Sequence, residues 1–163
     1  YLDLALKKYY TARRKALEEG VLPVAKPIPG KPRLYVASPK NSLPEALQEE
    51  FAFMREGLLE KYEQLLPGFV LDAGPSYDGT TLEKAAAAGC DLLAVPEIQA
   101  VKMQNEDNTY YITLIHAVYR VRDGQSVSLN TYGSSTKVLT PLEALLHGSS
   151  AMIAESAAWV NGK

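Results

Sequence analysis

The chain lacks most of the features that mark disulfide-bonded, membrane-spanning or nucleotide-binding proteins. Its 163 residues include one cysteine, Cys90, so no disulfide can form within the chain. No apolar run approaches the roughly 20 residues that a membrane-crossing helix needs. The glycine-rich phosphate loops and the serine-hydrolase elbow are also missing from the sequence. With 47% apolar and 22% charged residues, the composition is that of an ordinary globular domain.

Basic residues are scarce over most of the chain. Residues 1–32 carry seven basic and three acidic side chains, whereas residues 33–163 carry ten basic and sixteen acidic ones. Nucleic-acid binding depends on clustered lysines and arginines that contact phosphates. The acidic excess of residues 33–163 therefore argues against a nucleic-acid partner, and the basic head segment is most simply a solvated helix.

The composition divides the chain near residue 32. Residues 1–20 have apolar side chains loosely on one side and basic ones around the rest, which predicts a helix. Residues 21–33 hold four prolines within ten positions, which predicts a semi-rigid extended connector because proline fixes φ. We therefore expect an N-terminal helix and proline-rich tether over residues 1–32, followed by a single α/β domain over residues 33–163.

The body begins with a predicted strand over residues 33–38 and a long amphipathic helix. Ser42 and Glu45 have the spacing of a capping box that would open this helix of about 24 residues. Apolar residues recur along it at steps of three and four, which places on one face Leu43, Leu47, Phe51, Met54, Leu58, Tyr62 and Leu65.

A second helix and strand follow a short predicted strand at residues 69–71. Thr80 and Glu83 have the spacing of another capping box, and the alanine-rich helix after them runs into Gly89. We expect Gly89 to adopt the left-handed conformation that ends many helices. The apolar run after it predicts a buried strand over residues 92–103, in which Pro96 would bend the strand or mark a sheet edge.

The last third of the chain changes from alternating helices and strands to consecutive strands. Residues 110–122 alternate between two faces, and Asp123-Gly124 predicts a tight hairpin turn to a strand over residues 126–137. Thr140, Pro141 and Glu143 predict a capped final helix. The fold class is therefore α/β (α+β): a mixed sheet in β-α-β-α-β-β-β-α order, with a C-terminal antiparallel meander and helices packed on it.

The loop at residues 72–79 is the first candidate for a binding site. Its sequence, DAGPSYDG, has the composition of a simple turn, but Asp72 and Asp78 offer carboxylates to a ligand or cation. Tyr77 lies at the tip, and exposed tyrosines are frequent in protein interfaces. We therefore assign Tyr77, Asp72 and Asp78 as possible interaction residues.

Two pairs of residues have the types that catalysis uses. Cys90 and His116 could form a thiolate–imidazole pair, but Cys90 follows a helix C-terminus, whose negative dipole raises a thiol pKa. Pro96-Glu97 resembles the strand end that carries the glutamate of nitrilase-type amidases, yet the cysteine motif that those enzymes need after it is missing. The two histidines lie 31 residues apart without a second cysteine, which does not suit zinc. We expect no catalytic residue, metal or cofactor.

The order of elements and the segment from Ala85 to Ile98 resemble a known family. Alanines, a glycine, a variable pair and an apolar strand, followed by a meander with a short turn at 118–124, are similar to the α/β domain of bacterial envelope lipoproteins. This group includes the TolB amino-terminal domain, the penicillin-binding-protein activator LpoB and the curli secretion protein CsgG. The extra hairpins of the curli channel are missing here, which argues against a pore.

The resemblance implies a non-enzymatic accessory protein that binds another protein and is either free in the periplasm or anchored to the outer membrane by a lipid upstream of Tyr1. Self-association through the unpaired edge of the meander is a further possibility. The alternative is a small enzyme or ligand-binding domain that uses the 72–79 loop or Cys90 and His116.

Overall fold

The computed structural model describes residues 2–19, 32–65, 70–71, 77–103, 109–136 and 140–160. Its helices are α1 (Leu2–Glu18), the 3-10 helix η1 (Glu45–Glu50), α2 (Phe51–Leu65), α3 (Thr81–Ala87) and α4 (Pro141–Val160). Its strands are β1 (Leu34–Val36), β2 (Lys40–Ser42), β3 (Val70–Leu71), β4 (Leu92–Lys102), β5 (Tyr110–Arg120) and β6 (Ser126–Ser135). Over these ranges, no helix is long and apolar enough to cross a membrane.

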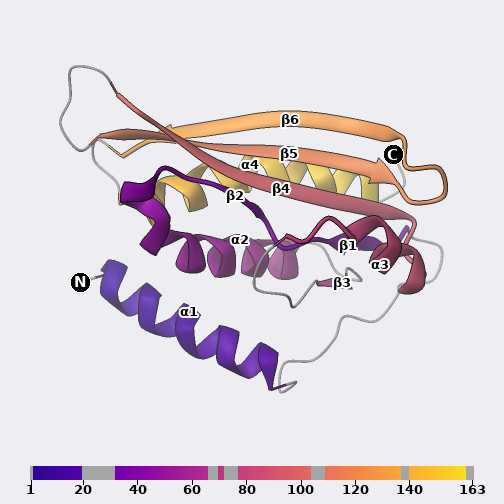
Figure 1. The fold of residues 1–163 in the computed structure, drawn as a ribbon, viewed down its shortest axis with the longest axis horizontal. Helices are drawn as coiled ribbons and strands as arrows, with labels where there is room; N and C mark the ends of the chain where they lie inside the picture. Colours follow the sequence, from indigo (N-terminus) through magenta and orange to yellow (C-terminus); the bar gives the residue numbers. More distant parts are fainter. Residues whose placement is uncertain are drawn as a thin grey trace.

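The strands form one six-stranded mixed sheet in the order β3-β1-β4-β5-β6, with β2 also paired to β4. The strands that are connected through helices, β1, β3 and β4, pair in parallel, and β4, β5 and β6 pair antiparallel. The predicted mixed sheet with a C-terminal meander is therefore confirmed. Figure 1 shows β4, β5 and β6 as long strands at one side of the molecule, with β6 outermost.

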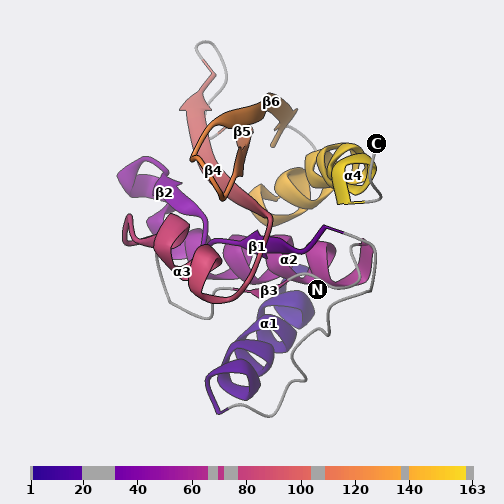
Figure 2. The same ribbon diagram turned by 90° about the vertical axis from the view of Figure 1, so that its right-hand side faces the viewer.

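Helices cover the two faces of the sheet unequally. One face packs under α2 and α4 in the main core, which includes Val36 of β1, Ile98 of β4 and Leu114 of β5. The predicted apolar stripe supplies much of that core, and all of its members whose side chains are described are buried. Among the described helices, only the short α3 covers the opposite face, over Leu93 and Val95. Figure 2 shows α3 and α4 on opposite sides of the sheet.

The N-terminal helix α1 packs on α2, on the side away from the sheet (Figures 1 and 2). Tyr10 is buried in the main core, and a buried ion cluster joins the two helices. In that cluster the Glu56 carboxylate accepts from the Nε atoms of Arg14 and Arg55 at 2.7 and 2.8 Å. Arg13 of α1 lies 3.5 Å from the same carboxylate and also pairs with Glu63. Charge pairs as well as apolar contacts therefore hold α1 to the body.

The start of the long helix differs from the prediction. Ser42 does not cap a helix, because it lies in β2 opposite Gln99 and its hydroxyl donates to the Glu97 carboxylate at 2.8 Å. The helical segment begins at Glu45 as a 3-10 turn after Pro44, without a side-chain cap. The predicted capping box of Ser42 and Glu45 is therefore wrong, and β2 is a strand that the sequence did not indicate.

The joint between α3 and β4 is partly as predicted. The Thr80 side chain makes no cap, because its hydroxyl donates to Asp78 at 2.7 Å, so the box of Thr80 and Glu83 is wrong. Gly89, however, has φ of 72°. The amides of Gly89 and Cys90 donate to the carbonyls of Ala86 and Ala85, both at 3.0 Å. These two bonds form a Schellman motif, and the predicted glycine stop is confirmed.

Pro96 lies in the middle of the sheet rather than at an edge. It is buried in β4 and is paired in register with His116 of β5. On the other side of β4, the ladder to β1 ends at Ala94 and the ladder to β2 begins at Glu97. Proline lacks an amide hydrogen, and on this side of β4 Pro96 falls in the gap between the β1 and β2 ladders. The predicted edge position is wrong. The reason for that prediction, that proline cannot donate a hydrogen bond to a ladder, still applies on the one side of β4 where Pro96 lies in the gap.

The last predicted features agree with the structure. Gly124, in the turn between β5 and β6, has φ of 70°. Thr140 and Glu143 form the full capping box at the start of α4, with reciprocal bonds of 3.1 and 3.2 Å. The proline-rich residues 20–31 lie outside the described residues, and the division of the chain at residue 32 remains a prediction.

Candidate functional site

The predicted loop site is described only in part. Asp72 lies outside the described residues. Asp78 is exposed and accepts hydrogen bonds from Lys84 Nζ at 2.8 Å and from the Thr80 amide at 2.9 Å. These bonds, that from Lys84 first, hold the pKa of the Asp78 carboxyl well below its usual range. Asp78 therefore anchors the start of α3, and its role as an interaction residue remains a prediction.

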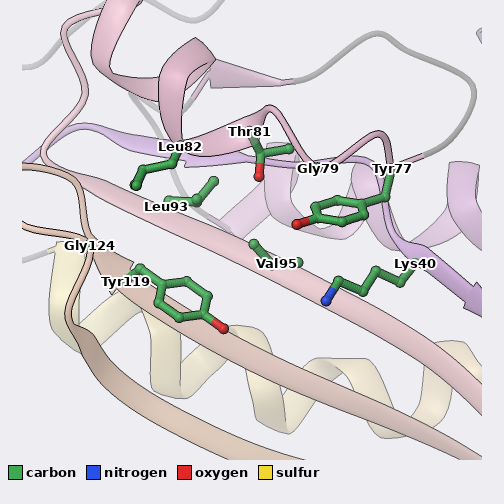
Figure 3. A pocket seen from close by; sticks show the side chains of 9 residues that line it. All are labelled: Lys40, Tyr77, Gly79, Thr81, Leu82, Leu93, Val95, Tyr119 and Gly124. Atoms are coloured by element: carbon green, nitrogen blue, oxygen red, sulfur yellow. The ribbon is translucent and has the colours of Figure 1, made fainter.

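Tyr77 belongs to a pocket on the less covered face of the sheet. It is half-buried and packs against the small core under α3. The pocket has a volume of about 190 Å³ and lies between α3, β4 and the hairpin that joins β5 to β6. Figure 3 shows side chains from separate elements around it, among them Lys40, Tyr77, Thr81, Leu93, Val95 and Tyr119.

The floor of the pocket is apolar and its walls carry polar groups. Leu93 and Val95 of β4 form the floor and are buried. In Figure 3 the hydroxyls of Tyr77 and Tyr119 and the ammonium of Lys40 lie around Val95. Lys40 Nζ is 4.8 Å from the centre of the Tyr77 ring, which is a cation–π contact. An apolar base with a few polar groups around it is the usual composition of a small-ligand site.

Sequence reasoning named Tyr77 as an interaction residue, which remains a prediction, and it did not point to Lys40 or Tyr119. Lys40 lies in β2, a three-residue strand whose sequence, KNS, has no apolar alternation. The alternation of residues 110–122 places Tyr119 on one face of its strand, but it does not show that helices leave this part of the face uncovered. Both residues reach the pocket through non-local strand pairing, Lys40 opposite Glu97 and Tyr119 opposite Leu93. No local sequence signal carries that information.

The structure does not bring Cys90 and His116 together. Cys90 packs in the small core under α3, where burial raises the pKa of its thiol. His116 lies in β5 on the opposite face of the sheet, 5.9 Å from Tyr62 of α2 between ring centroids. Burial lowers the pKa of His116 to about 4. A thiolate–imidazole pair cannot form between residues on opposite faces of a sheet, so this alternative is wrong.

Glu97 does not have the surroundings of a general base. Its carboxylate accepts from Gln99 Nε2 and Ser42 Oγ, both at 2.8 Å. The bond from Gln99, followed by that from Ser42, lowers the pKa of Glu97. An enzymatic base needs a pKa raised toward neutrality. In the part of the chain that the structure describes, no three histidine, cysteine or acidic side chains lie close enough to hold a metal.

The fold resembles those of solved bacterial proteins. The sequence matches no known protein family and no curated protein. Among solved structures, the PelC dodecamer of Paraburkholderia phytofirmans matches with a TM-score of 0.55 at 10% identity, over 86% of this chain and 95% of PelC. The hypothetical protein CT253 of Chlamydia trachomatis matches with a TM-score of 0.55 at 11% identity, over 82% of this chain and 100% of CT253.

Lipoproteins are among the more distant matches. Lipoprotein GNA1162 of Neisseria meningitidis is similar over 78% of this chain and 99% of its own, at 10% identity and a TM-score of 0.47. TolB and LpoB, which the sequence pattern resembles, match with TM-scores of 0.44 and 0.33. The predicted resemblance is confirmed at the level of fold, and identities this low show nothing beyond the fold.

Proposed function

We propose that this protein is a non-enzymatic accessory protein of the bacterial cell envelope that acts through protein–protein contacts, beginning with contacts between copies of itself. The observation that carries this proposal is the unpaired, unprotected edge of β6. Within the described residues, β6 pairs only with β5 and ends the strand order.

The edge lacks most of the features that keep sheet edges apart. Natural edge strands are usually short, or carry lysine, proline or a bulge that prevents pairing with another chain. β6 is 10 residues long, and its sequence SVSLNTYGSS contains no charged residue and no proline. Its one irregularity with β5 lies at its start, opposite Val118 and Tyr119. An edge of this length and composition suits pairing with a second copy.

Three large apolar side chains on the sheet face beside this edge are exposed. Leu129 of β6 is 67% exposed, and Tyr111 of β5 and Val101 of β4 are 45% and 64% exposed. Exposed apolar side chains on a sheet face favour contact with another protein surface. The dodecamer formed by PelC supports the same proposal, because PelC shares this fold over 95% of its length.

The envelope part of the proposal rests on the fold. It implies a precursor with a signal peptide and a lipid-attachable cysteine upstream of Tyr1. We expect the full-length product to be found in the membrane fraction and to incorporate labelled palmitate. A precursor without such a cysteine, or a product found only in the cytoplasm, contradicts this part alone.

Sedimentation velocity of the purified chain tests the self-association. We expect an oligomer, and we expect Leu129→Lys with Thr131→Lys to shift it to a monomer, since two exposed charges beside the edge disfavour pairing. Ala154→Lys adds a similar charge to an exposed position of α4 and should sediment like the wild type. A wild-type chain that stays monomeric at every concentration reached, or a double variant that still assembles, contradicts self-association through β6.

A further inference from the structure

The pocket beside α3 has a chemical character that the proposed self-association does not use. We propose that it binds a carboxylate carried on a short aliphatic group, with Lys40, Tyr77 and Tyr119 holding the carboxylate and Leu93 and Val95 contacting the aliphatic part. The inference concerns a different surface from the β6 edge, and a monomeric chain could bind such a ligand.

The polar groups in the pocket are available to a ligand. In the described part of the chain, the hydroxyls of Tyr77 and Tyr119 have no hydrogen-bond partner, and Lys40 makes no salt bridge. The Lys40 charge does reach Glu97, whose pKa is lowered by the bonds from Gln99 and Ser42 and also by this ammonium. The carboxylates near the pocket are occupied by other donors. Glu97 accepts from Ser42 and Gln99, and Asp78 accepts from Lys84. Lys40 is therefore the cation that can serve an incoming anion.

The position of the Lys40 ammonium is fixed by two features of the fold. Its backbone pairs with β4 opposite Glu97, which sets where the side chain leaves the sheet. Its Nζ then lies 4.8 Å from the Tyr77 ring centre, and this contact holds the ammonium at the wall of the pocket (Figure 3). A preplaced cation loses less freedom when a ligand binds, which favours affinity.

The balance of charge selects the class of anion. The pocket offers one ammonium and two neutral hydroxyl donors, which together match the single charge and several lone pairs of a carboxylate. Phosphate sites usually add an arginine fork to supply more donors, and no arginine is among the residues that line this pocket. The buried floor of Leu93 and Val95 favours a ligand whose carboxylate is attached to an aliphatic group.

Two sources could present this chemistry: the C-terminus of a polypeptide and a free short-chain acid. N-acetylvaline, 3-methylbutanoate and N-acetylvalinamide separate these sources and isolate the charge. We propose to titrate each into the isotope-labelled full chain and to follow amide shifts in the NMR spectrum. Binding should shift the amides of residues 77–81, 93–95 and 119. The amide probe should bind about tenfold more weakly than either acid, since it lacks the charge.

Matched variants connect binding to the pocket. Lys40→Met keeps an unbranched apolar side chain but removes the ammonium, and it should weaken acid binding by about tenfold. Tyr119→Phe removes only a hydroxyl and should weaken it by roughly threefold. Lys102→Met, at the exposed far end of β4, should bind like the wild type. Thermal unfolding of each variant shows whether the fold is kept. If Lys40→Met does not fold, Tyr119→Phe still tests the site, because it retains the aromatic ring.

Each result of these titrations either supports or overturns the proposal. Tighter binding of N-acetylvaline supports the site and identifies a polypeptide C-terminus, whereas tighter binding of 3-methylbutanoate supports it and identifies a free acid. Equal binding of the amide and the acids overturns the proposal. So does wild-type affinity in both pocket variants, or the lack of any shift up to about 10 mM ligand, the weak limit for a specific site.

Discussion

The Glu56 carboxylate accepts a hydrogen bond from the Nε of Arg14 at 2.7 Å, and both side chains are buried between α1 and α2. The same carboxylate serves Arg55 and Arg13, so three guanidinium groups converge on one acidic side chain. Removing one partner of a buried ion pair leaves the others desolvated without compensation. The docking of the N-terminal helix therefore depends on Glu56 more than on any surface charge.

We expect Glu56→Gln to lower the free energy of unfolding by about 3 kcal/mol or to release α1 locally. In hydrogen exchange, the amides of α1 should lose roughly 100-fold of their protection. Glu50→Gln is the matched control, because its pair with Lys7 is partly exposed, and it should cost less than about 1 kcal/mol. Equal effects of the two substitutions would show that the buried cluster does not hold the helix.

Gly89 and Gly148 provide a matched test of backbone conformation. A Cβ at either position would meet no atom within 4 Å, but Gly89 has φ of 72° and Gly148 lies inside α4. Gly89→Ala should lower the free energy of unfolding by about 1 kcal/mol, because the left-handed conformation is unfavourable for alanine. Gly148→Ala should raise it by roughly 0.5–1 kcal/mol. Chemical denaturation measures both, and the same sign for the two would contradict the helix stop.

Thr140 and Ser42 distinguish a real helix cap from one that only the spacing suggests. Thr140→Ala should cost about 1 kcal/mol, because its side chain accepts from the Glu143 amide at 3.2 Å. Ser42→Ala removes an exposed bond to Glu97 and should change stability by less than about 0.5 kcal/mol. Urea unfolding of both variants gives the comparison. A larger loss for Ser42→Ala would mean that this serine has a capping role after all.

The buried histidine predicts how stability depends on pH. His116 has its pKa lowered to about 4 by burial, so the folded chain keeps it neutral where the unfolded chain protonates it. Stability should therefore fall as pH decreases from about 6.5 to about 4, by about 3 kcal/mol in total. His116→Gln should show a smaller loss over this range in parallel urea titrations. Identical profiles for the variant and the wild type would mean that His116 does not cause the loss.

Much of the fold could be predicted because its signals are local. The apolar residues from Leu43 to Tyr62 follow the helical period. Gly89 comes after a run of alanines whose helix would otherwise continue. The strand at residues 110–120 alternates between faces, and the turn at Gly124 has the residue type that a positive φ needs. Each of these features is decided by neighbours within a few positions along the chain.

The candidate site could not be predicted because it is assembled from distant parts. Tyr77 was identified as a contact residue, but Lys40 and Tyr119 reach the pocket only through pairing with β4. The same pairing removes Ser42 from its expected cap, since Glu97 offers its hydroxyl another partner. Side chains with the same local spacing, such as Thr80 and Thr140, therefore have different roles.

The sequence by itself determined the order of helices and strands apart from β2, the antiparallel meander and the end of α3, because periodicity and backbone preference act over short distances. Tertiary structure alone decided the strand order, the docking of α1 through Glu56 and the position of Pro96 in a gap of the ladder. It also decided that Cys90 and His116 lie on opposite faces of the sheet. Those outcomes depend on which distant groups can satisfy one another's hydrogen bonds and charges once the core excludes water.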